Sequence, residues 1–286
     1  MRIDLHTHST ASDGTTSPVD LVRAAAATGL DVVALTDHDT TAGWAGAAEA
    51  LPPGLTLIPG AELSCVWPAP DGRVIGMHLL AYLFDPAEPV LRAERARVRD
   101  GRIVRARRMV ELMQADGYPV RWDDVLREAA GGPVGRPHVA RALVRHRLVA
   151  DVASAFTPEW IGRGGRYRVV KPDTEVVDAI RMVRAAGGVP VVAHPLAAAR
   201  GAVVPAEAYA AMAAAGLAGL EADHLDHDAD ARRRTREIAA DHGLLVTGSS
   251  DFHGANKAVA LGAATTDPAV YEELLDQATG SAPVAA

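Results

Sequence analysis

The chain has 286 residues with 49% hydrophobic content, 4% aromatic content and a formal net charge of −7, which suffices for one sizeable aliphatic core or for one core with an inserted subdomain. Its single cysteine excludes a disulfide framework within the chain, and no apolar run approaches the roughly 20 residues of a membrane-spanning helix. Because no secretory signal is recognised at the N-terminus either, we expect a cytoplasmic protein that makes no membrane contact.

Short apolar runs rich in β-branched residues recur along the chain, and each ends at a polar cluster. These predicted strands cover residues 3–5, 32–35, 55–58, 76–83, 189–193, 217–222 and 244–246. Most of them are continuously apolar rather than alternating, which is typical of parallel strands that are buried on both faces.

Helical patterns lie between several of the strands. The first begins after Ser17, a good N-cap, with Pro18 at the first helical position and Gly29 closing the end. Two more are predicted over residues 174–186 and 229–241, the first ended by Gly187 and the second by Gly243. Strands that alternate with helices of this length indicate βα units, and so an α/β protein with a parallel sheet or barrel.

The middle of the chain has a different pattern. From about residue 86 to residue 168 the signals are mainly helical, so we expect a helical insertion there, with residues 1–85 and 169–286 forming the barrel. Residues 88–149 carry 14 arginines against 8 acids, whereas the whole chain is acidic. This contrast indicates an anionic ligand, although a solvated arginine-rich helix face explains it equally well. The tail after Thr279 is expected to be frayed.

Potential metal ligands occur near the end of almost every predicted strand. They are His6 and His8, Asp37 to Asp39, Glu62, His78, His194, Glu221, Asp251 and His253, with Asp13 shortly after the first pair. In a parallel barrel the carboxyl ends of all strands lie on one rim, where such folds build their active sites. Side chains that are far apart in sequence are therefore expected to converge.

The spacing within these clusters suits a metal. In His6-Thr7-His8 the two imidazoles are two residues apart on an extended chain, so they point to the same side and can bind one ion. Asp251-Phe252-His253 repeats the spacing. One such pair is a weak signal, but several pairs at strand ends are hard to explain as core or surface histidines. Mixed imidazole and carboxylate donors suit manganese, iron or zinc, and carboxylate-rich sets shift the preference toward manganese and magnesium.

Together these segments resemble the PHP (polymerase and histidinol phosphatase) family. The resemblance rests on His6-Thr7-His8-Ser9, Ser12-Asp13-Gly14, Thr36-Asp37-His38-Asp39, Pro59-Gly60-Ala61-Glu62, His194-Pro195 and Gly248-Ser249-Ser250-Asp251-Phe252-His253, in the family's order. It implies a distorted (β/α)7 barrel that holds two or three divalent metal ions, with manganese favoured over iron, zinc or magnesium.

The resemblance also implies a set of ligands for each ion. One ion would be held by His6, His8, Glu62 and Asp251; a second by Glu62 as a bridge with His78 and His194; and a third by Asp13, His38 and His253. His78 is the least secure of these, because a lone histidine in a strand is often a satisfied core residue. Glu221 and Asp37 are expected to orient the ligands.

Finer resemblance points to the small bacterial PHP phosphoesterases. Gly135-Arg136-Pro137-His138 and Gly219-Leu220-Glu221 carry it. Arg136 beside a helix N-terminus suits a phosphate clamp, and Lys171 is expected to reach the same phosphate; the alternative is exposure to solvent. His227, in a polar turn, is expected to contact the substrate or to protonate the leaving group, with His224 as a competitor.

The residues and the resemblance together predict a metal-dependent phosphoesterase. The subgroup that the chain resembles includes nucleoside 3′,5′-bisphosphate phosphatases, so the resemblance implies that a metal-activated hydroxide removes the 3′-phosphate of such a bisphosphate. The alternative is a 5′→3′ exonuclease that acts on short 5′-phosphorylated RNA, and a non-catalytic nucleotide-sensing module is less favoured. The expected partner is thus a small phosphorylated nucleotide or a short RNA, and no stable protein partner is inferred.

Overall fold

The computed structural model describes residues 1–130, 132, 134–170 and 173–286, and these form two compact units. The first unit combines residues 1–95 with 173–286, and the second spans residues 96–172. Among the described residues, no helix is long and apolar enough to cross a membrane.

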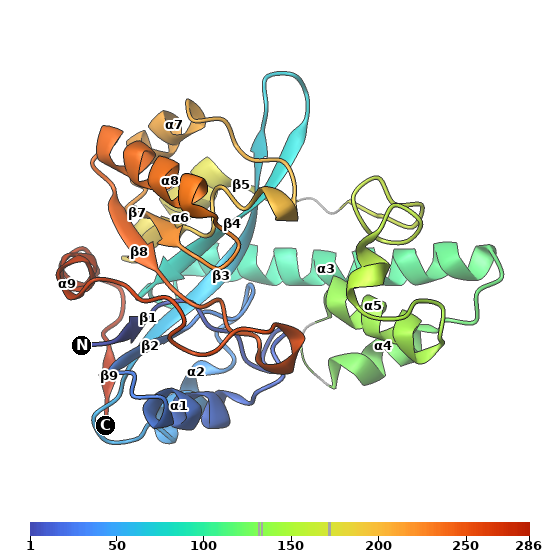
Figure 1. The fold of residues 1–286 in the computed structure, drawn as a ribbon, viewed down its shortest axis with the longest axis horizontal. Coiled ribbons are helices and arrows are strands. Elements are labelled where there is room, and N and C mark those ends of the chain that lie inside the picture. The colour runs from blue at the N-terminus through green and yellow to red at the C-terminus, as the bar shows by residue number, and fades with distance from the viewer. Residues whose placement is uncertain (131, 133, 171–172) are drawn as a thin grey trace. The chain divides into compact units, whose positions relative to one another are not determined.

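The first unit contains a strongly curved sheet (Figure 1). Its main path runs β1 (Ile3–Asp4), β2 (Val32–Leu35), β3 (Thr56–Pro68), β4 (Val74–Tyr82), β6 (Val189–Val192), β7 (Gly219–Asp223) and β8 (Leu245–Gly248). Two short strands, β5 (Thr174–Glu175) and β9 (Val284–Ala285), pair with β3. Just beyond the two edge strands, Thr7 forms a parallel bridge with Phe252, and the His8 N–H donates to the Phe252 carbonyl at 2.8 Å. The edges therefore meet, and the predicted distorted seven-stranded α/β barrel is confirmed.

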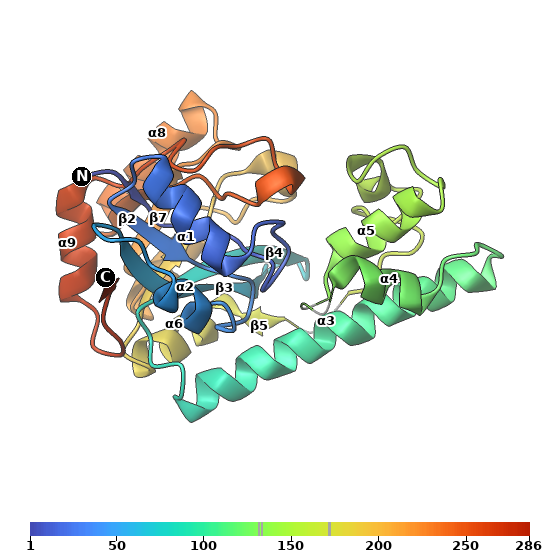
Figure 2. The same cartoon turned by 90° about the horizontal axis from the view of Figure 1, so that it is seen from below.

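Helices surround the barrel. They are α1 (Pro18–Ala27), α2 (Trp44–Glu49), α6 (Val176–Ala185), α7 (Ala208–Ala214), α8 (Ala229–Asp241) and α9 (Pro268–Asp276). Figure 2 shows α1 and α2 next to each other beside β2 and β3, which they contact. Ser17 caps α1 by accepting from the Asp20 N–H, as expected from the Ser-Pro start. The interior is largely aliphatic, and the buried Tyr82 hydroxyl donates to the Leu5 carbonyl at 2.9 Å.

The third strand differs from its prediction. We expected it to end near Ile58 and Glu62 to follow it, but β3 continues to Pro68 and forms an antiparallel ladder with β4, in which Glu62 pairs with Leu80. Pro59-Gly60 is not a strand end, because Gly60 pairs with Tyr82 in this ladder. Glycine suits the position because a Cβ there would lie 3.1 Å from the Ala81 carbonyl oxygen. The β3–β4 and β4–β6 pairs are antiparallel, which is the distortion of this barrel.

The C-terminal tail is also ordered, so the expectation that it frays was wrong. The Gly187 carbonyl accepts from the N–H groups of Thr279 and Gly280, and the Ser281 N–H donates to the Leu83 carbonyl at 2.7 Å. A Cβ at Gly280 would lie 2.3 Å from the Ala186 carbonyl oxygen, so only glycine fits this approach. The tail then adds β9 to the sheet.

The second unit is helical. Helix α3 (Pro89–Ala115) runs from the first unit into the second, which also holds α4 (Trp122–Ala129) and α5 (Arg136–Arg145). This unit has an apolar cluster of its own, with Met109, Met113, Val139 and Leu143 among its buried residues. Lys171 lies outside the described residues.

Candidate metal centre

All of the predicted metal ligands lie in the first unit, and most of them are buried. Among the residues that the structure describes, three groups offer ligand atoms that lie within 4.8 Å of one another. The groups are His6, His8, Glu62 and Asp251; His8, Asp13, His38 and His253; and His38, Glu62 and His78. His8, His38 and Glu62 each belong to two groups, so the three form one continuous cluster.

The first group lies where β1 and β8 end. His6 and His8 point to the same side, as their spacing predicts, and their Nε2 atoms are 3.0 Å apart. Both nitrogens also face Glu62 Oε2, at 3.2 and 3.1 Å, and Asp251 Oδ1, at 3.4 and 3.3 Å. Two imidazoles and two carboxylates around one point form a donor set that fits a divalent ion.

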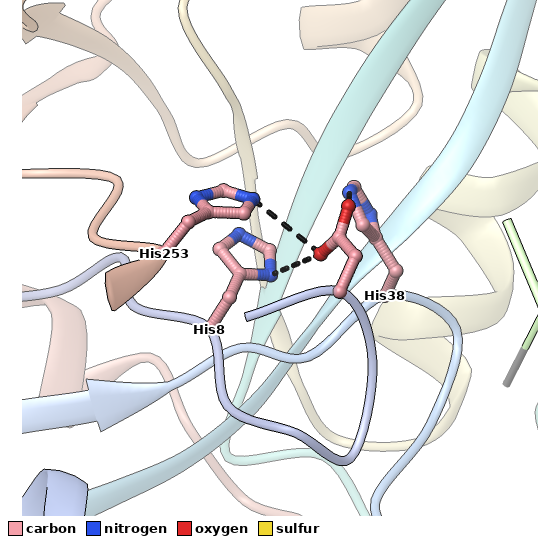
Figure 3. Close-up of side chains that lie close together, drawn as sticks. His8, His38 and His253 are labelled. Carbon is pink, nitrogen blue, oxygen red and sulfur yellow. Dashed lines mark ion pairs between the residues drawn. The ribbon is translucent and has the colours of Figure 1, made fainter. Parts of the chain in front are cut away.

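The second group is centred on Asp13. Figure 3 shows the rings of His8, His38 and His253 converging on one carboxylate. Asp13 Oδ1 lies 3.4 Å from His253 Nε2 and 3.8 Å from His8 Nδ1, and Oδ2 lies 3.7 Å from His38 Nε2. Asp13 is on a loop rather than a strand, so the loop must be held in place by other contacts.

Asp37 supplies those contacts. Its Oδ1 accepts from the Ser9 N–H at 2.8 Å and from the Ser12 hydroxyl at 2.5 Å, and its Oδ2 accepts from the Ser9 hydroxyl at 2.6 Å. Gly14 completes the turn, because a Cβ there would lie 2.5 Å from the His8 carbonyl oxygen. Asp37 is therefore an organiser of the loop and not itself a member of the ligand groups.

Glu62 connects the groups through its two oxygens. Oε2 faces His6, His8 and also His38, whose Nδ1 is 3.2 Å away. Oε1 faces His78 Nδ1 at 2.7 Å and His194 Nε2 at 3.3 Å. Each oxygen of Glu62 therefore faces a different set of imidazoles. His194 lies beside the cluster but outside the three groups, and its Nε2 also accepts from Arg200 Nη1 at 2.9 Å.

Burial and mutual proximity shift the protonation of these groups. Burial alone would lower the pKa of His8, but hydrogen bonds to Asp251 and Glu62 raise it to about 9. For His194, burial and the nearby Arg200 lower the pKa to about 3. Burial favours the neutral carboxyl of Glu62, yet His78, His38 and His6 hold its pKa well below the usual range. The carboxylates of the cluster are thus ionised, as metal ligands must be.

Glu221 lies directly behind the cluster. It is fully buried, and its Oε1 accepts from the Ser249 hydroxyl and faces His6 Nδ1 at 3.1 Å. Its Oε2 accepts from the His194 N–H at 2.8 Å. Glu221 therefore orients the ring of His6 and the backbone of His194, and orientation of ligands is the role expected of it.

Of the three phosphate-directed predictions outside the cluster, His227 and Arg136 lie among the described residues. His227 is buried, with Nδ1 2.9 Å from the Ala222 carbonyl oxygen and Nε2 accepting from the Leu196 N–H at 3.1 Å. Both ring nitrogens are used by the backbone, so this geometry favours a role in holding the Leu196 loop, and proton donation stays a prediction. Arg136 starts α5 in the second unit and lies over the Phe156 ring at 5.5 Å.

Two cations at the cluster were missed by the sequence reasoning. Arg200 Nη2 and Lys257 Nζ lie 2.7 and 2.6 Å from Asp251 Oδ2. The available signals were position and rarity: Arg200 follows His194 by six residues, and Lys257 follows His253 by four and is one of only two lysines in the chain. Neither signal by itself distinguishes a site residue from a surface cation.

A barrel that gathers imidazoles and carboxylates in one cluster, most of them just beyond its strands and Glu62 and His78 within β3 and β4, is the architecture of a metal-dependent hydrolase. The PHP domain family model matches residues 4–114. The 3′,5′-nucleoside bisphosphate phosphatase of Chromobacterium violaceum is 34% identical over 253 residues, which cover 88% of this chain and 87% of that protein. The chain thus belongs to the PHP family and is a metal-dependent hydrolase, as expected.

Two further comparisons agree with this assignment. The 5′-3′ exoribonuclease Rnm of Salmonella typhimurium is 32% identical over 265 residues, which cover 87% of this chain and 84% of that protein. A solved structure from Bifidobacterium adolescentis, described as a candidate metal-dependent phosphoesterase, superposes with a TM-score of 0.88 at 37% identity and covers 97% of this chain and 96% of its own.

Proposed function

We propose that the chain hydrolyses a phosphate monoester of a small nucleotide, with the 3′-phosphate of nucleoside 3′,5′-bisphosphates as the favoured target. The observation that carries this proposal is the continuous cluster of three ligand groups joined by Glu62, His8 and His38. Such a cluster suits phosphoryl transfer, in which charge on several oxygens must be stabilised at once. The substrate is suggested by the phosphatase relative, which matches this chain over most of its length.

In this proposal the chain's own residues hold and orient the ions. His6, His8, Glu62 and Asp251 would hold one ion, Glu62 with His78 and His194 a second, and Asp13, His38 and His253 a third. Divalent ions at these positions, with manganese favoured by the mixed donors, supply Lewis acidity and an activated water near neutral pH. Glu221 fixes the His6 ring and the His194 backbone, and Asp37 fixes the loop that presents Asp13.

Arg136 is proposed to bind the phosphate that is not cleaved. Burial, with Arg168 and Arg102 nearby, lowers its pKa to about 10, so three guanidinium groups gather in this part of the second unit. Like charges that cluster in this way are stabilised by an anion. Lys171 remains proposed as a second contact to that phosphate. The arginine-rich second unit is correspondingly proposed to act as a substrate cap.

A second candidate function is 5′→3′ exonuclease activity on short 5′-phosphorylated RNA. It is favoured by the similarity to a protein named as an exoribonuclease. Both functions use the same metal chemistry and differ in the leaving group. A module that senses nucleotides without turnover is less favoured, because recognition alone does not require three linked ligand groups.

One experiment separates these possibilities. The manganese-loaded protein is incubated with adenosine 3′,5′-bisphosphate and, separately, with a short 5′-phosphorylated RNA, with Asp13→Ala as the inactive control. Release of phosphate and AMP from the bisphosphate, lost in the control, supports the proposal. Release of mononucleotides from the RNA, without release of phosphate from the bisphosphate, supports the exonuclease function instead. If metal is bound and neither substrate reacts, the nucleotide proposal is wrong.

A further inference from the structure

Asp251 is the point at which two cations meet the candidate ligand cluster. Its Oδ1 faces His6 and His8, whereas its Oδ2 faces Arg200 Nη2 at 2.7 Å, Lys257 Nζ at 2.6 Å and His224 Nε2 at 3.2 Å. The two cations therefore contact the first ligand group through Asp251 itself. The proposed ligand sets include neither cation.

Arg200 is held in a defined orientation. Its Nε donates to Asp226 Oδ2 at 2.5 Å, its Nη1 to His194 Nε2 at 2.9 Å and its Nη2 to Asp251. A guanidinium has more N–H groups than these contacts use, and the side chain is 34% exposed. Arg200 is thus oriented by the site and still offers donors to a group that arrives from solvent.

Lys257 is positioned by the loop that follows His253. Gly254 has a positive φ of +64° and packs against Thr15, and the Asn256 side chain donates to the Asp13 carbonyl at 2.7 Å. This loop is therefore tied to the loop that carries Asp13. Lys257 Nζ makes a close contact to Asp251 and a longer one of 4.0 Å to Asp226, and its side chain is 20% exposed.

Two cations and two carboxylates meet at this position, because Arg200 and Lys257 both face Asp251 and Asp226. Asp251 Oδ2 also faces His224 Nε2 at 3.2 Å, and both cations keep N–H groups that these contacts do not use. Asp251 also belongs to a ligand group, so its charge is shared with whatever cation that group holds. A metal ion held by Asp251 would leave positive charge at this position, and that charge together with the spare N–H groups matches a tetrahedral oxyanion.

We propose that Arg200 and Lys257 bind oxygens of the phosphoryl group that is hydrolysed, beside Oδ2 of Asp251. This inference rests on the proposed function and adds to it the residues that grip the reacting group. Water adds to phosphorus, the ester P–O bond breaks, and the proton from water ends on the leaving oxygen. Arg200 and Lys257 transfer no proton; they stabilise the negative charge that develops on the phosphoryl oxygens.

The first measurement is the binding of inorganic phosphate to the manganese-loaded protein by calorimetry. Arg200→Gln and Lys257→Gln are each expected to weaken phosphate binding by about 10- to 100-fold, the effect of losing a charge-assisted hydrogen bond. Lys257→Arg should restore part of the loss. Arg233→Gln is the matched control, because Arg233 pairs with Asp230 on the exposed surface of α8, and its affinity should equal that of the parent protein.

The manganese content of each variant, measured by elemental analysis, separates direct binding from support of Asp251. Unchanged metal content with weaker phosphate binding supports the inference. Loss of metal together with loss of phosphate binding overturns it, because the cations would then act only by positioning Asp251. Phosphate affinity that is unchanged in Arg200→Gln and in Lys257→Gln overturns it as well.

Kinetics provide the second readout. With p-nitrophenyl phosphate and with adenosine 3′,5′-bisphosphate, kcat should fall by the same factor in Arg200→Gln, because both substrates share the reacting group. Arg136→Gln should instead raise KM for the bisphosphate only. A loss in Arg200→Gln confined to the bisphosphate contradicts the inference. If the parent protein hydrolyses no nucleotide but binds phosphate in an Arg200-dependent manner, the proposed function fails and the phosphate site stands.

Discussion

Glu221 accepts a hydrogen bond from Nδ1 of His6 at 3.1 Å, and this contact decides which nitrogen of His6 faces the ligand cluster. With the proton on Nδ1, the lone pair is on Nε2, which lies close to Glu62 and Asp251. The imidazole is thereby set in the tautomer and the orientation that a metal ion requires.

We predict that Glu221→Gln weakens metal binding by about 10- to 100-fold, the usual effect of altering a group that orients a ligand. The amide is nearly the same size, so the fold should persist. Equilibrium dialysis against manganese measures the effect, and Glu237→Gln on the exposed face of α8 is the control. Equal affinities for the parent protein and Glu221→Gln would contradict the assigned role.

The Asp37→Asn variant tests whether Asp37 holds the loop that carries Asp13. Asp37→Asn removes a charge that accepts three hydrogen bonds from Ser9 and Ser12, so the loop should loosen. We expect metal stoichiometry to fall while the group around His6 stays occupied, as measured by elemental analysis after desalting. Asp20→Asn at the start of α1 serves as the control. Full stoichiometry in Asp37→Asn would show that the loop needs no such support.

Metal binding should depend on pH with a defined sign. The pKa of His8 is raised to about 9, so below that pH the chelator-stripped protein carries a proton that must leave before this imidazole can bind a metal. Affinity should therefore increase as pH rises toward 9, by about tenfold per pH unit for each proton displaced. His194, with a pKa of about 3, adds no proton above pH 5 or so. Calorimetry in two buffers of different ionisation enthalpy counts the protons released; a count of zero at pH 7 contradicts the prediction.

The C-terminal tail offers a test of stability. Gly280→Ala forces a methyl group to within 2.3 Å of the Ala186 carbonyl oxygen and should destabilise the protein by about 1–3 kcal/mol. Gly76→Ala adds the same methyl where no atom lies within 4 Å, and it should be nearly neutral. Chemical denaturation of both variants measures the difference. Equal stabilities would mean that the tail contributes little to the barrel.

The parts of this protein that could be predicted depend on local pattern. A continuously apolar run such as Val32–Leu35 predicts a buried strand, and Ser17-Pro18 predicts the start of a helix. The His6-Thr7-His8 spacing predicts that both imidazole rings point to one side. Convergence of the ligands followed because the ends of barrel strands share one rim. For these features, residues that are close in the sequence carry enough information for the prediction.

The remaining features depend on contacts between distant segments. From local sequence, Pro59-Gly60 predicts the end of a strand. In the structure it lies inside β3, because this segment pairs with β4. In the sequence, nothing distinguishes Arg200 and Lys257 from surface cations. In the structure, both contact Asp251. His227 lies in a polar turn by sequence, but its nitrogens are used by Ala222 and Leu196. No spacing rule encodes such pairings.

The chain leaves the first unit and returns to it at neighbouring positions: Glu94 and Thr174 both belong to that unit, and the Thr174 hydroxyl donates to the Glu94 carboxylate. All of the candidate ligands lie outside the inserted segment. An insertion attached at one place can lengthen, shorten or be exchanged at little cost to the sheet that it interrupts. In evolution, the metal chemistry of such a barrel can thus be inherited unchanged while the inserted segment is remodelled for different substrates.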